Sequence, residues 1–134
     1  MNIVLGVTGS ISAYKAVDIL RLFQKNGHQV SVIMTRAAQE LIPAYTFETF
    51  APGKVFTKMF VKHQDPVLHV RICDENDLLL IAPATANTIA KLALGLANDA
   101  LSCIALALNP KARLLIAPAM NGKMWLHPAT QQNV

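Results

Sequence analysis

Short runs of apolar residues alternate along the chain with segments in which apolar residues recur every three or four positions. The uninterrupted runs predict β-strands at residues 2–7, 30–34, 78–82 and 113–117, and the first of these is expected to be fully buried. The helical period predicts helices at residues 13–25, 35–41, 67–75, 83–96 and 98–108. Ser10 or Ser12 is expected to cap the first of these helices, and Asn26 with Gly27 is expected to end it.

Strands that alternate with helices are typical of a parallel sheet with helices on both faces. We therefore predict the α/β class, as a three-layer, doubly wound parallel sheet of Rossmann-like type. Residues 43–66 are less regular, because Pro43, Pro52 and Gly53 interrupt them. Within this stretch, residues 55–61 are expected to form either a strand or an extended arm.

Ligands bind at the carboxyl ends of the strands in such sheets. The segments that follow the four predicted strands are residues 8–12, 34–37, 83–88 and 117–121. In the first segment, Gly9 permits close approach of the backbone, and Ser10 and Ser12 add hydroxyl donors beside backbone N–H groups. This segment fits a phosphate site and a plain helix-capping turn equally well.

The first two strand ends argue against two common kinds of nucleotide site. The dinucleotide pattern GxGxxG is absent, and no acidic residue follows the second strand to hold an adenosine ribose. The Walker pattern GxxxxGK[ST] is absent as well. Thr35 and Arg36 instead offer a hydroxyl group and a positive charge, which suit the phosphate of a mononucleotide better than NAD.

The third and fourth strand ends combine small residues with polar ones. Thr85, Asn87 and Thr88 would supply polar edges for a flat ring that contains several heteroatoms. An equally good interpretation is a turn in which Thr85 caps a helix. Asn121 offers amide donors and an acceptor at the fourth strand end, although an Asn before Gly122 is also common in turns.

One histidine and two cysteines carry side chains that are capable of chemistry. His69 lies in an apolar segment, where an imidazole could act as a general base or simply pack. His69 and Cys73 have the spacing of two metal ligands on one helix face, but no third ligand matches, and we expect no metal site. Cys103 lies in an apolar helical run and is expected to be a core thiol.

Composition narrows the class of protein. A chain of 134 residues fits one domain, and 53% hydrophobic with only 15% charged residues favours burial of surface in a homo-oligomer or a compact parallel sheet. The net charge of +4 is scattered, which argues against nucleic acid as a partner. Two cysteines without a CxxC pattern suit a reducing cytoplasm, and no apolar run is long enough to predict a membrane span.

The strand-end segments also occur together in an order that is similar to one family. They are GVTGSISAYK from residue 6, MTRAA from residue 34, APATANTIAK from residue 82, and APAMN from residue 117 with Met124 and Trp125. This ordered set resembles the homo-oligomeric flavin-containing cysteine decarboxylases. Within them it is similar to the phosphopantothenoylcysteine decarboxylase domain of the bifunctional coenzyme A biosynthesis flavoproteins, over all 134 residues.

The resemblance implies that the chain binds FMN, and it assigns residues to the site. The residues expected near the phosphate and ribityl chain are Gly9, Ser10, Ile11 and Thr35. The residues expected to line the rest of the flavin site are Thr85, Ala86, Asn87, Thr88, Ser102 and Ala119. His69 matches the active-site histidine of the family, and Asn121 matches the asparagine of the PxMNxxMW motif, which holds the substrate carboxylate.

The implied activity is the decarboxylation of 4'-phosphopantothenoylcysteine to 4'-phosphopantetheine in coenzyme A biosynthesis, by a carbon–carbon lyase. Oxidation at the carbon that bears the thiol would create the electron sink for loss of carbon dioxide, and a later reduction would restore the redox balance. The implied partners are other copies of the chain, in a trimer or a dodecamer of trimers, and a phosphopantothenoylcysteine synthetase, fused or associated. His69 and Asn121 would meet across the interface between subunits.

Three alternatives stay open at this point. One is decarboxylation of a peptide that ends in cysteine, by a member of the same family. Another is flavin prenyl transfer on a related fold, against which the Gly9–Ser12 loop and the PxMNxxMW match both argue. The third is a non-catalytic FMN-binding flavoprotein that regulates a partner.

The chain departs from the family at one point. Family members continue past the PxMNxxMW motif into a flap whose cysteine donates the last proton, and neither Cys73 nor Cys103 matches that position. We therefore expect residues 1–134 to form a single FMN-binding decarboxylase domain without this flap. The sequence would then be either part of a longer protein or an incomplete form.

Overall fold

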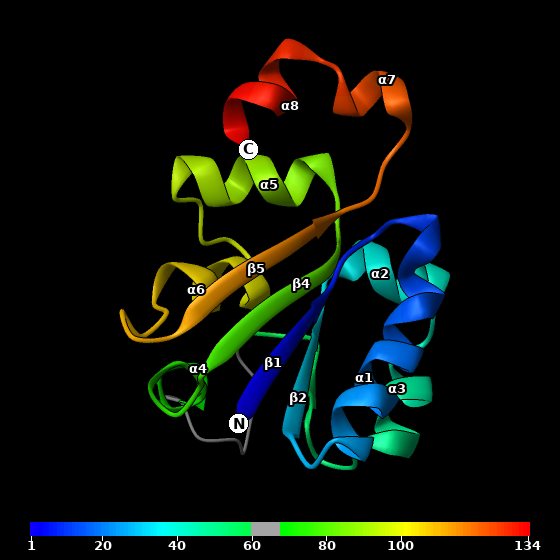
Figure 1. The fold of residues 1–134 in the computed structure, drawn as a ribbon, viewed down its shortest axis with the longest axis vertical. Helices are drawn as coiled ribbons and strands as arrows, with labels where there is room; N and C mark the ends of the chain where they lie inside the picture. Colours follow the sequence, from blue (N-terminus) through cyan, green and yellow to red (C-terminus); the bar gives the residue numbers. More distant parts are fainter. Residues whose placement is uncertain (60–67) are drawn as a thin grey trace.

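The structure, a computed structural model, describes residues 1–59 and 68–134, with the backbone alone at residues 68 and 69. Within this part of the chain, five parallel strands form one sheet in the order β3-β2-β1-β4-β5 (Figure 1). The strands are β1 (Asn2–Val7), β2 (Gln29–Met34), β3 (Val55–Phe56), β4 (Leu78–Ala84) and β5 (Arg113–Pro118).

Helices connect the strands and continue beyond β5. They are the 3₁₀ helix η1 (Ile11–Tyr14) and α1 (Lys15–Lys25), α2 (Arg36–Leu41), α3 (Ala44–Phe50), α4 (Leu68–Asp74), α5 (Ala86–Leu94), α6 (Ala100–Leu106), α7 (Gly122–Trp125) and α8 (Pro128–Asn133). Figure 1 shows α1, α2 and α3 beside one face of the sheet, α4 and α6 beside the other, and α8 next to α5. None of the helices in the described residues has the length and apolar character needed to cross a lipid bilayer.

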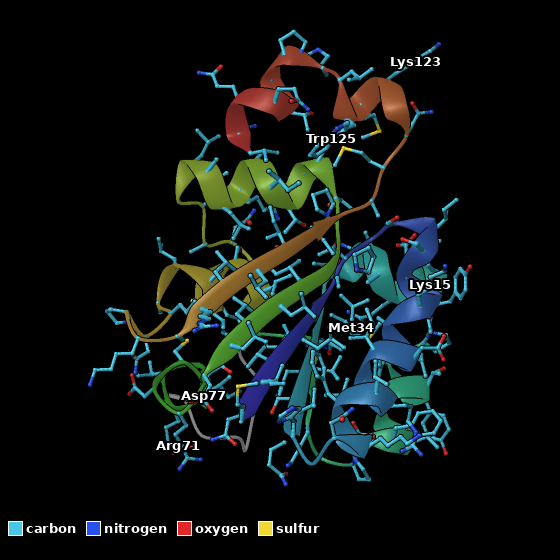
Figure 2. The ribbon with its side chains drawn as sticks, in the orientation of Figure 1. Lys15, Met34, Arg71, Asp77, Lys123 and Trp125 are labelled. Carbon is cyan, nitrogen blue, oxygen red and sulfur yellow. The ribbon has the colours of Figure 1, made fainter. Side chains whose placement is uncertain are left out.

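The sheet separates two apolar cores, because successive side chains of a strand point to opposite faces. Leu5 and Val7 of β1 pack with Leu20 of α1 and Phe47 of α3 on one face. Val4 packs with residues of α5 and α6 on the other face. Figure 2 shows Met34, at the carboxyl end of β2, among the packed side chains of the interior. The prediction of a three-layer, doubly wound α/β fold is confirmed.

The order of the strands places a topological switch point between β1 and β4. From β1 the chain moves outward to β2 and β3, and it then returns to the other side of β1 to form β4 and β5. The connections on the two sides therefore leave the carboxyl ends of β1 and β4 in opposite directions. The crevice that this opens is where doubly wound sheets bind their ligands.

At β4 and at α3 the structure differs from the sequence-based prediction. Pro83 and Ala84 extend β4, where a helix was predicted to begin at Pro83, because Ala84 pairs with Pro118 of β5 and Thr85 then caps α5. Residues 44–50 form α3 within the stretch predicted to be irregular, with Phe47 as its buried anchor. The predicted strand or arm at 55–61 is described to residue 59 only, and β3 takes two of its residues.

Candidate functional site

The loops that follow β1, β4 and β5 enclose a pocket of about 670 Å³ at the switch point. Its lining residues are Gly9, Ser10, Ile11, Ser12, Thr85, Ala86, Ala119, Met120, Asn121 and Met124. Seven of the twelve residues predicted for the site are among them: Gly9, Ser10, Ile11, Thr85, Ala86, Ala119 and Asn121. The fold thus brings together segments that lie far apart in the sequence.

The loop after β1 presents two hydroxyl groups to the pocket. Ser10 caps η1, since its Oγ accepts a hydrogen bond from the backbone N–H of Ser12. The Oγ atoms of Ser10 and Ser12 lie 3.1 Å apart and form a hydrogen bond. Ile11 between them is 87% exposed, which is unusual for an isoleucine and leaves an apolar side chain at the rim of the pocket.

Gly9 allows this loop to approach α2 closely. A Cβ atom at Gly9 would lie 2.5 Å from the Cβ of Ala37, closer than two carbon atoms can pack. A residue without a Cβ is therefore required where the loop after β1 contacts α2, the helix that follows β2. Thr35, at the end of β2, joins the same region through a 3.0 Å hydrogen bond from its N–H to the carbonyl of Val7.

The loop after β4 is fixed by a helix cap. The Oγ1 of Thr85 accepts a hydrogen bond from the N–H of Thr88 at 3.2 Å and donates one to the Oγ1 of Thr88 at 3.1 Å. The helix-capping interpretation of this segment is confirmed, and Thr85 also lines the pocket. Ala86, next to it, contributes a small side chain to the wall.

Thr8 joins the loops after β1 and β4. Its hydroxyl donates a hydrogen bond to the carbonyl of Pro83 at 2.6 Å and accepts one from the N–H of Thr85 at 3.0 Å. The side chain is fully buried and does not line the pocket. Thr8 was not predicted to belong to the site, and its position directly after a buried strand, before Gly9, is the signal that could have singled it out.

The segment after β5 supplies the remaining wall. The N–H of Ala119 donates a 3.0 Å hydrogen bond to the carbonyl of Ala84, which holds this segment against β4. Asn121 caps α7, since its Oδ1 accepts from the N–H of Lys123 at 2.8 Å, and its Nδ2 group is the part that can donate to a ligand. Lys123 itself extends outward from the molecule (Figure 2).

Met120 and Met124, which were not predicted as site residues, complete the apolar part of the pocket. Their spacing of four residues brackets Asn121 within the PxMNxxMW motif. Thioether groups pack favourably at the edge and face of aromatic rings. Two methionines on one wall are therefore suited to a flat aromatic ligand.

Four predicted residues do not line this pocket: Thr35, Asn87, Thr88 and Ser102. The hydroxyl of Thr35 accepts from the N–H of Ala38 at 3.2 Å, as the cap of α2. Asn87 is exposed and Thr88 is buried beneath Thr85. The hydroxyl of Ser102 is buried in a capping box with Asp99. Their contacts with a flavin stay predictions.

The side chain of His69 lies outside the described part of the chain. Its backbone is the second residue of α4, a helix beside the amino ends of the strands (Figure 1). The carbonyl of Glu75, just after α4, accepts a 3.0 Å hydrogen bond from the Nδ2 of Asn2 at the start of β1. Within one copy of the chain, α4 therefore lies at the end of the sheet opposite to Asn121.

The clearest electrostatic contact near the pocket joins α5 to α6. Lys91 Nζ lies 2.7 Å from Asp99 Oδ2, and Asp99 also accepts from the N–H of Ser102 at 2.8 Å. Partial burial acts to raise the pKa of the Asp99 carboxyl, but the hydrogen bonds from Lys91 and Ser102 outweigh it and hold the pKa below its usual value. This ion pair supports the helix that Thr85 caps.

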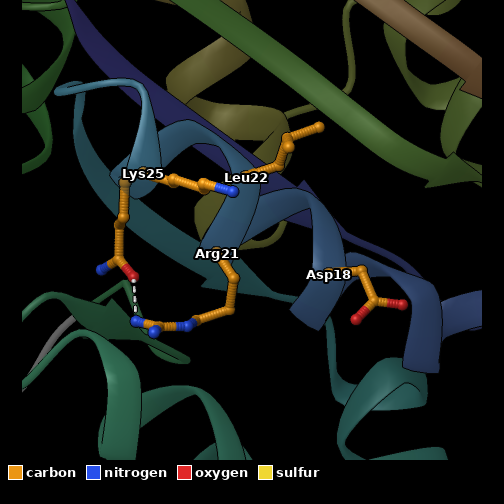
Figure 3. A pocket seen from close by; sticks show the side chains of 5 residues that line it. Asp18, Arg21, Leu22 and Lys25 are labelled. Carbon is orange, nitrogen blue, oxygen red and sulfur yellow. Dashed lines mark hydrogen bonds between the residues drawn. The ribbon is translucent and has the colours of Figure 1, made fainter.

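A second hollow, of about 510 Å³, lies along the outer face of α1 (Figure 3). Asp18, Arg21, Leu22 and Lys25 line it, and Arg21 donates a 3.1 Å hydrogen bond to the side chain of Gln24. These side chains carry both signs of charge and project from an exposed helix. They offer no buried polar group to a ligand, so the pocket at the switch point is the better candidate.

The residues at the switch point fit a flavin mononucleotide. Ser10 and Ser12 provide hydroxyl donors for a phosphate, Ala86 and Ala119 leave room for a flat ring, and Met120 with Met124 provide an apolar surface. A pocket that is mostly apolar with a few converging polar groups is typical of cofactor sites. The donor set and the space therefore agree with the cofactor that the sequence resemblance implies.

Comparisons with known proteins point to the same family. The family model described as Flavoprotein matches residues 1–134. The chain is 42% identical to a probable phosphopantothenoylcysteine decarboxylase of Streptococcus mutans, covering 99% of this chain and 75% of the relative. It is 44% identical to the coenzyme A biosynthesis bifunctional protein CoaBC of Mycolicibacterium smegmatis, covering 99% of this chain but only 31% of that protein.

Solved structures agree in fold. The FMN-dependent cysteine decarboxylase SpaF superposes with a TM-score of 0.89 at 32% identity, covering 99% of this chain and 76% of SpaF. A mutant PPC decarboxylase in complex with pantothenoylaminoethenethiol superposes with a TM-score of 0.82 at 30% identity, covering 98% of this chain and 74% of that one. The chain therefore belongs to the flavoprotein family, in the group that contains the phosphopantothenoylcysteine decarboxylases.

Proposed function

We propose that this chain binds FMN and catalyses the decarboxylation of 4'-phosphopantothenoylcysteine to 4'-phosphopantetheine in coenzyme A biosynthesis. The observation that carries the proposal is the pocket at the switch point, which the segments GSIS, TA and AMN of three strand ends line together. The 42% identity to a probable phosphopantothenoylcysteine decarboxylase supports this substrate in particular.

Each part of the pocket has a role in this proposal. Ser10 and Ser12 hold the phosphate of the cofactor, and Ala86, Ala119 and the two methionines hold its ring system. Bound FMN supplies reversible uptake of a hydride, so that a decarboxylation with no net redox change needs no external oxidant. Asn121 donates from Nδ2 to the substrate carboxylate and holds it in the orientation from which carbon dioxide leaves.

The active unit is proposed to be a homotrimer, alone or within a dodecamer. The backbone of α4 lies at the end of the sheet opposite to Asn121, which supports a place for His69 in the pocket of a neighbouring copy. His69 would then act there as a base or an orienting group. Exposed apolar side chains near the pocket mouth, Ile11 at 87% and Met124 at 50%, are consistent with a neighbour that covers them.

Two further parts of the proposal concern the setting of the enzyme. We place it in the cytoplasm, since Cys73 and Cys103 are both free thiols, as in proteins of reducing compartments. We also place it with a phosphopantothenoylcysteine synthetase, fused or associated. The bifunctional relative, of which the chain spans 31%, supports that pairing.

The proposal is tested by reconstituting the purified protein with FMN and measuring release of carbon dioxide from phosphopantothenoylcysteine. The expected result is a bound flavin and release that Asn121→Asp and His69→Asn each reduce at least about a hundredfold. A peptide that ends in cysteine is the comparison substrate. Faster release of carbon dioxide from the peptide would show that the peptide, and not phosphopantothenoylcysteine, is the better substrate. Binding of FMN without release of carbon dioxide from either substrate would favour a non-catalytic flavoprotein that regulates a partner.

A further inference from the structure

The backbone ladder between β1 and β4 ends before the pocket begins. The last pair in register is Gly6 with Ile81, two residues before Thr8 and Pro83. The ladder between β4 and β5 is irregular over the same stretch, between Ile81 and Ala84. Pro83 has no N–H group to donate, so the backbone alone cannot continue a regular ladder at this point.

Beyond the end of the ladder, the side chain of Thr8 makes the hydrogen bonds that join β1 to β4. Its Oγ1 donates to the carbonyl of Pro83 at 2.6 Å and accepts from the N–H of Thr85 at 3.0 Å. One hydroxyl thus supplies the donor and the acceptor that a ladder residue would supply from its backbone. The side chain is fully buried, so water does not compete for these bonds.

Thr8 also holds the other wall of the pocket. Its backbone carbonyl accepts a 2.9 Å hydrogen bond from the N–H of Ser10. The same residue therefore fixes Ser10, in the loop after β1, and Thr85, in the loop after β4. These two loops contribute the hydroxyl groups of Ser10 and Thr85 and the small residue Ala86 to the lining of the pocket.

We propose that Thr8 is a positioning residue for FMN binding, which sets the separation of the two pocket walls without touching the ligand. The inference rests on the proposed function, because it takes FMN as the ligand. Valine has nearly the shape of threonine but no hydroxyl, so Thr8→Val leaves the N–H of Thr85 and the carbonyl of Pro83 buried without this partner. Serine keeps the hydroxyl and loses only a methyl group.

The experiment compares Thr8→Val and Thr8→Ser with the wild-type protein. The dissociation constant of FMN is measured by quenching of flavin fluorescence, and unfolding is followed by circular dichroism with and without FMN. We expect the dissociation constant of Thr8→Val to rise at least about tenfold and that of Thr8→Ser to stay within about threefold of wild type. FMN should also raise the unfolding temperature of Thr8→Val less than that of wild type.

A matched control separates positioning from general loss of stability. Val30 is 3% exposed at the amino end of β2, away from the pocket, and Val30→Ala removes buried methyl groups there. It should lower the unfolding temperature and leave the dissociation constant of FMN within about twofold of wild type. If Thr8→Val does not fold, Thr8→Ala and Thr8→Ser replace it, since both lose the methyl group and only Thr8→Ala loses the hydroxyl.

The possible outcomes are distinct. Wild-type affinity in Thr8→Val, or in Thr8→Ala where that variant is used, would overturn the role of Thr8 while the proposed function stands. An equal loss of affinity in Thr8→Ser would also overturn it, because the hydroxyl would then not be the operative group. A wild-type protein that does not bind FMN would overturn the proposed function and this inference together.

Discussion

At the residue scale, the polar side chains of the pocket are held in place by bonds to their own local backbone. Ser10, Thr85 and Asn121 each cap the helix that follows them, and each also lines the pocket. A side chain that caps a helix has already lost most of its rotational freedom before a ligand arrives. The pocket is therefore preorganised, and ordering its side chains adds little to the cost of binding.

Gly9 gives a prediction about this preorganised loop. The methyl group of Gly9→Ala would overlap Ala37, so the loop after β1 must move away from α2. We expect a loss of about 1–3 kcal/mol in the free energy of unfolding, as for other overpacked sites, and FMN affinity about tenfold weaker. Urea denaturation and a fluorescence titration measure the two effects.

Gly122→Ala is the control for that substitution. A Cβ at Gly122 meets nothing within 4 Å, and the residue begins α7, where alanine is well tolerated. Its unfolding free energy should stay within about 0.5 kcal/mol of wild type. If Gly9→Ala were as well tolerated as Gly122→Ala, the close contact with α2 would not be a constraint on the loop.

The two cysteines give a second prediction at this scale. Burial raises the pKa of the Cys73 thiol to about 11, and its Sγ donates to the carbonyl of Ile104. Alkylation requires the thiolate, so iodoacetamide should modify half-buried Cys103 well before Cys73 in the native protein at pH 8. Mass spectrometry of peptides from a time course measures both rates, and modification of both at similar rates in urea is the control.

At the scale of elements, α5 and α6 are held together by polar contacts as well as by their apolar faces. Asp99 caps α6 in a capping box with Ser102 and also binds Lys91 of α5. One carboxylate thus fixes the start of one helix and the relative position of the other. The position of α5 matters to the site, because its first residues belong to the pocket wall.

This carboxylate predicts a dependence of stability on pH. The pKa of Asp99 is lowered in the folded protein, so its contribution is present above the unfolded-state pKa, near 4, and is lost as the pH falls through the lower folded-state value. We expect Asp99→Asn to lower the unfolding free energy by about 1 kcal/mol at pH 7. The difference in unfolding free energy between variant and wild type should vanish at the lowest pH values. Urea denaturation from pH 2 to 7 tests this, with Glu40→Gln as an exposed control that should change little.

The pattern of the sequence predicted most elements but not all of their limits. β1 was predicted at residues 2–7 and forms there, because five apolar residues in a row leave no polar face for a surface helix. α3 was missed, because Pro43 and Pro52 on either side suggested a loop, whereas Pro43 only precedes the helix and Phe47 anchors it. Pro83 was predicted to start a helix. The pairing of Ala84 with Pro118, which extends β4 instead, involves a strand that is distant in the sequence.

At the scale of the whole molecule, the sheet ends in an edge strand with the apolar composition of an interior strand. In β5, Leu114 is 43% exposed and Leu115 is 52% exposed, and these neighbours point to opposite faces. Parallel strands are normally covered on both faces, and an uncovered apolar edge favours pairing with other chains. We therefore expect β5 to favour self-association of the protein.

Leu115→Lys tests this property of the edge. A charge on an exposed edge strand opposes pairing, so the variant should scatter less light than wild type when both are concentrated to about 1 mM and warmed. Its midpoint of urea denaturation should be nearly unchanged, since half of the leucine side chain is already in contact with water. Equal scattering by both proteins would mean that β5 takes no part in self-association.

The site could be predicted to the extent that it depends on strand ends. Gly9, Ser10, Thr85 and Asn121 lie in the segments that follow β1, β4 and β5, and parallel topology was enough to bring them together. Thr8 was not found, because a buried hydroxyl gains its role only from carbonyl and N–H groups about 75 residues away in the chain. Ser102 was assigned by resemblance, and the sequence pattern did not reveal its use in a capping box.

The arrangement of the pocket has a consequence for synthesis of the protein. Its first wall is made within the opening residues of the chain, but Ala119, Met120 and Asn121 emerge from the ribosome near the end of these 134 residues. A nascent chain that stops short of Asn121 therefore cannot hold the cofactor between all the segments that line the pocket, and capture of FMN must follow synthesis of residues 119–121.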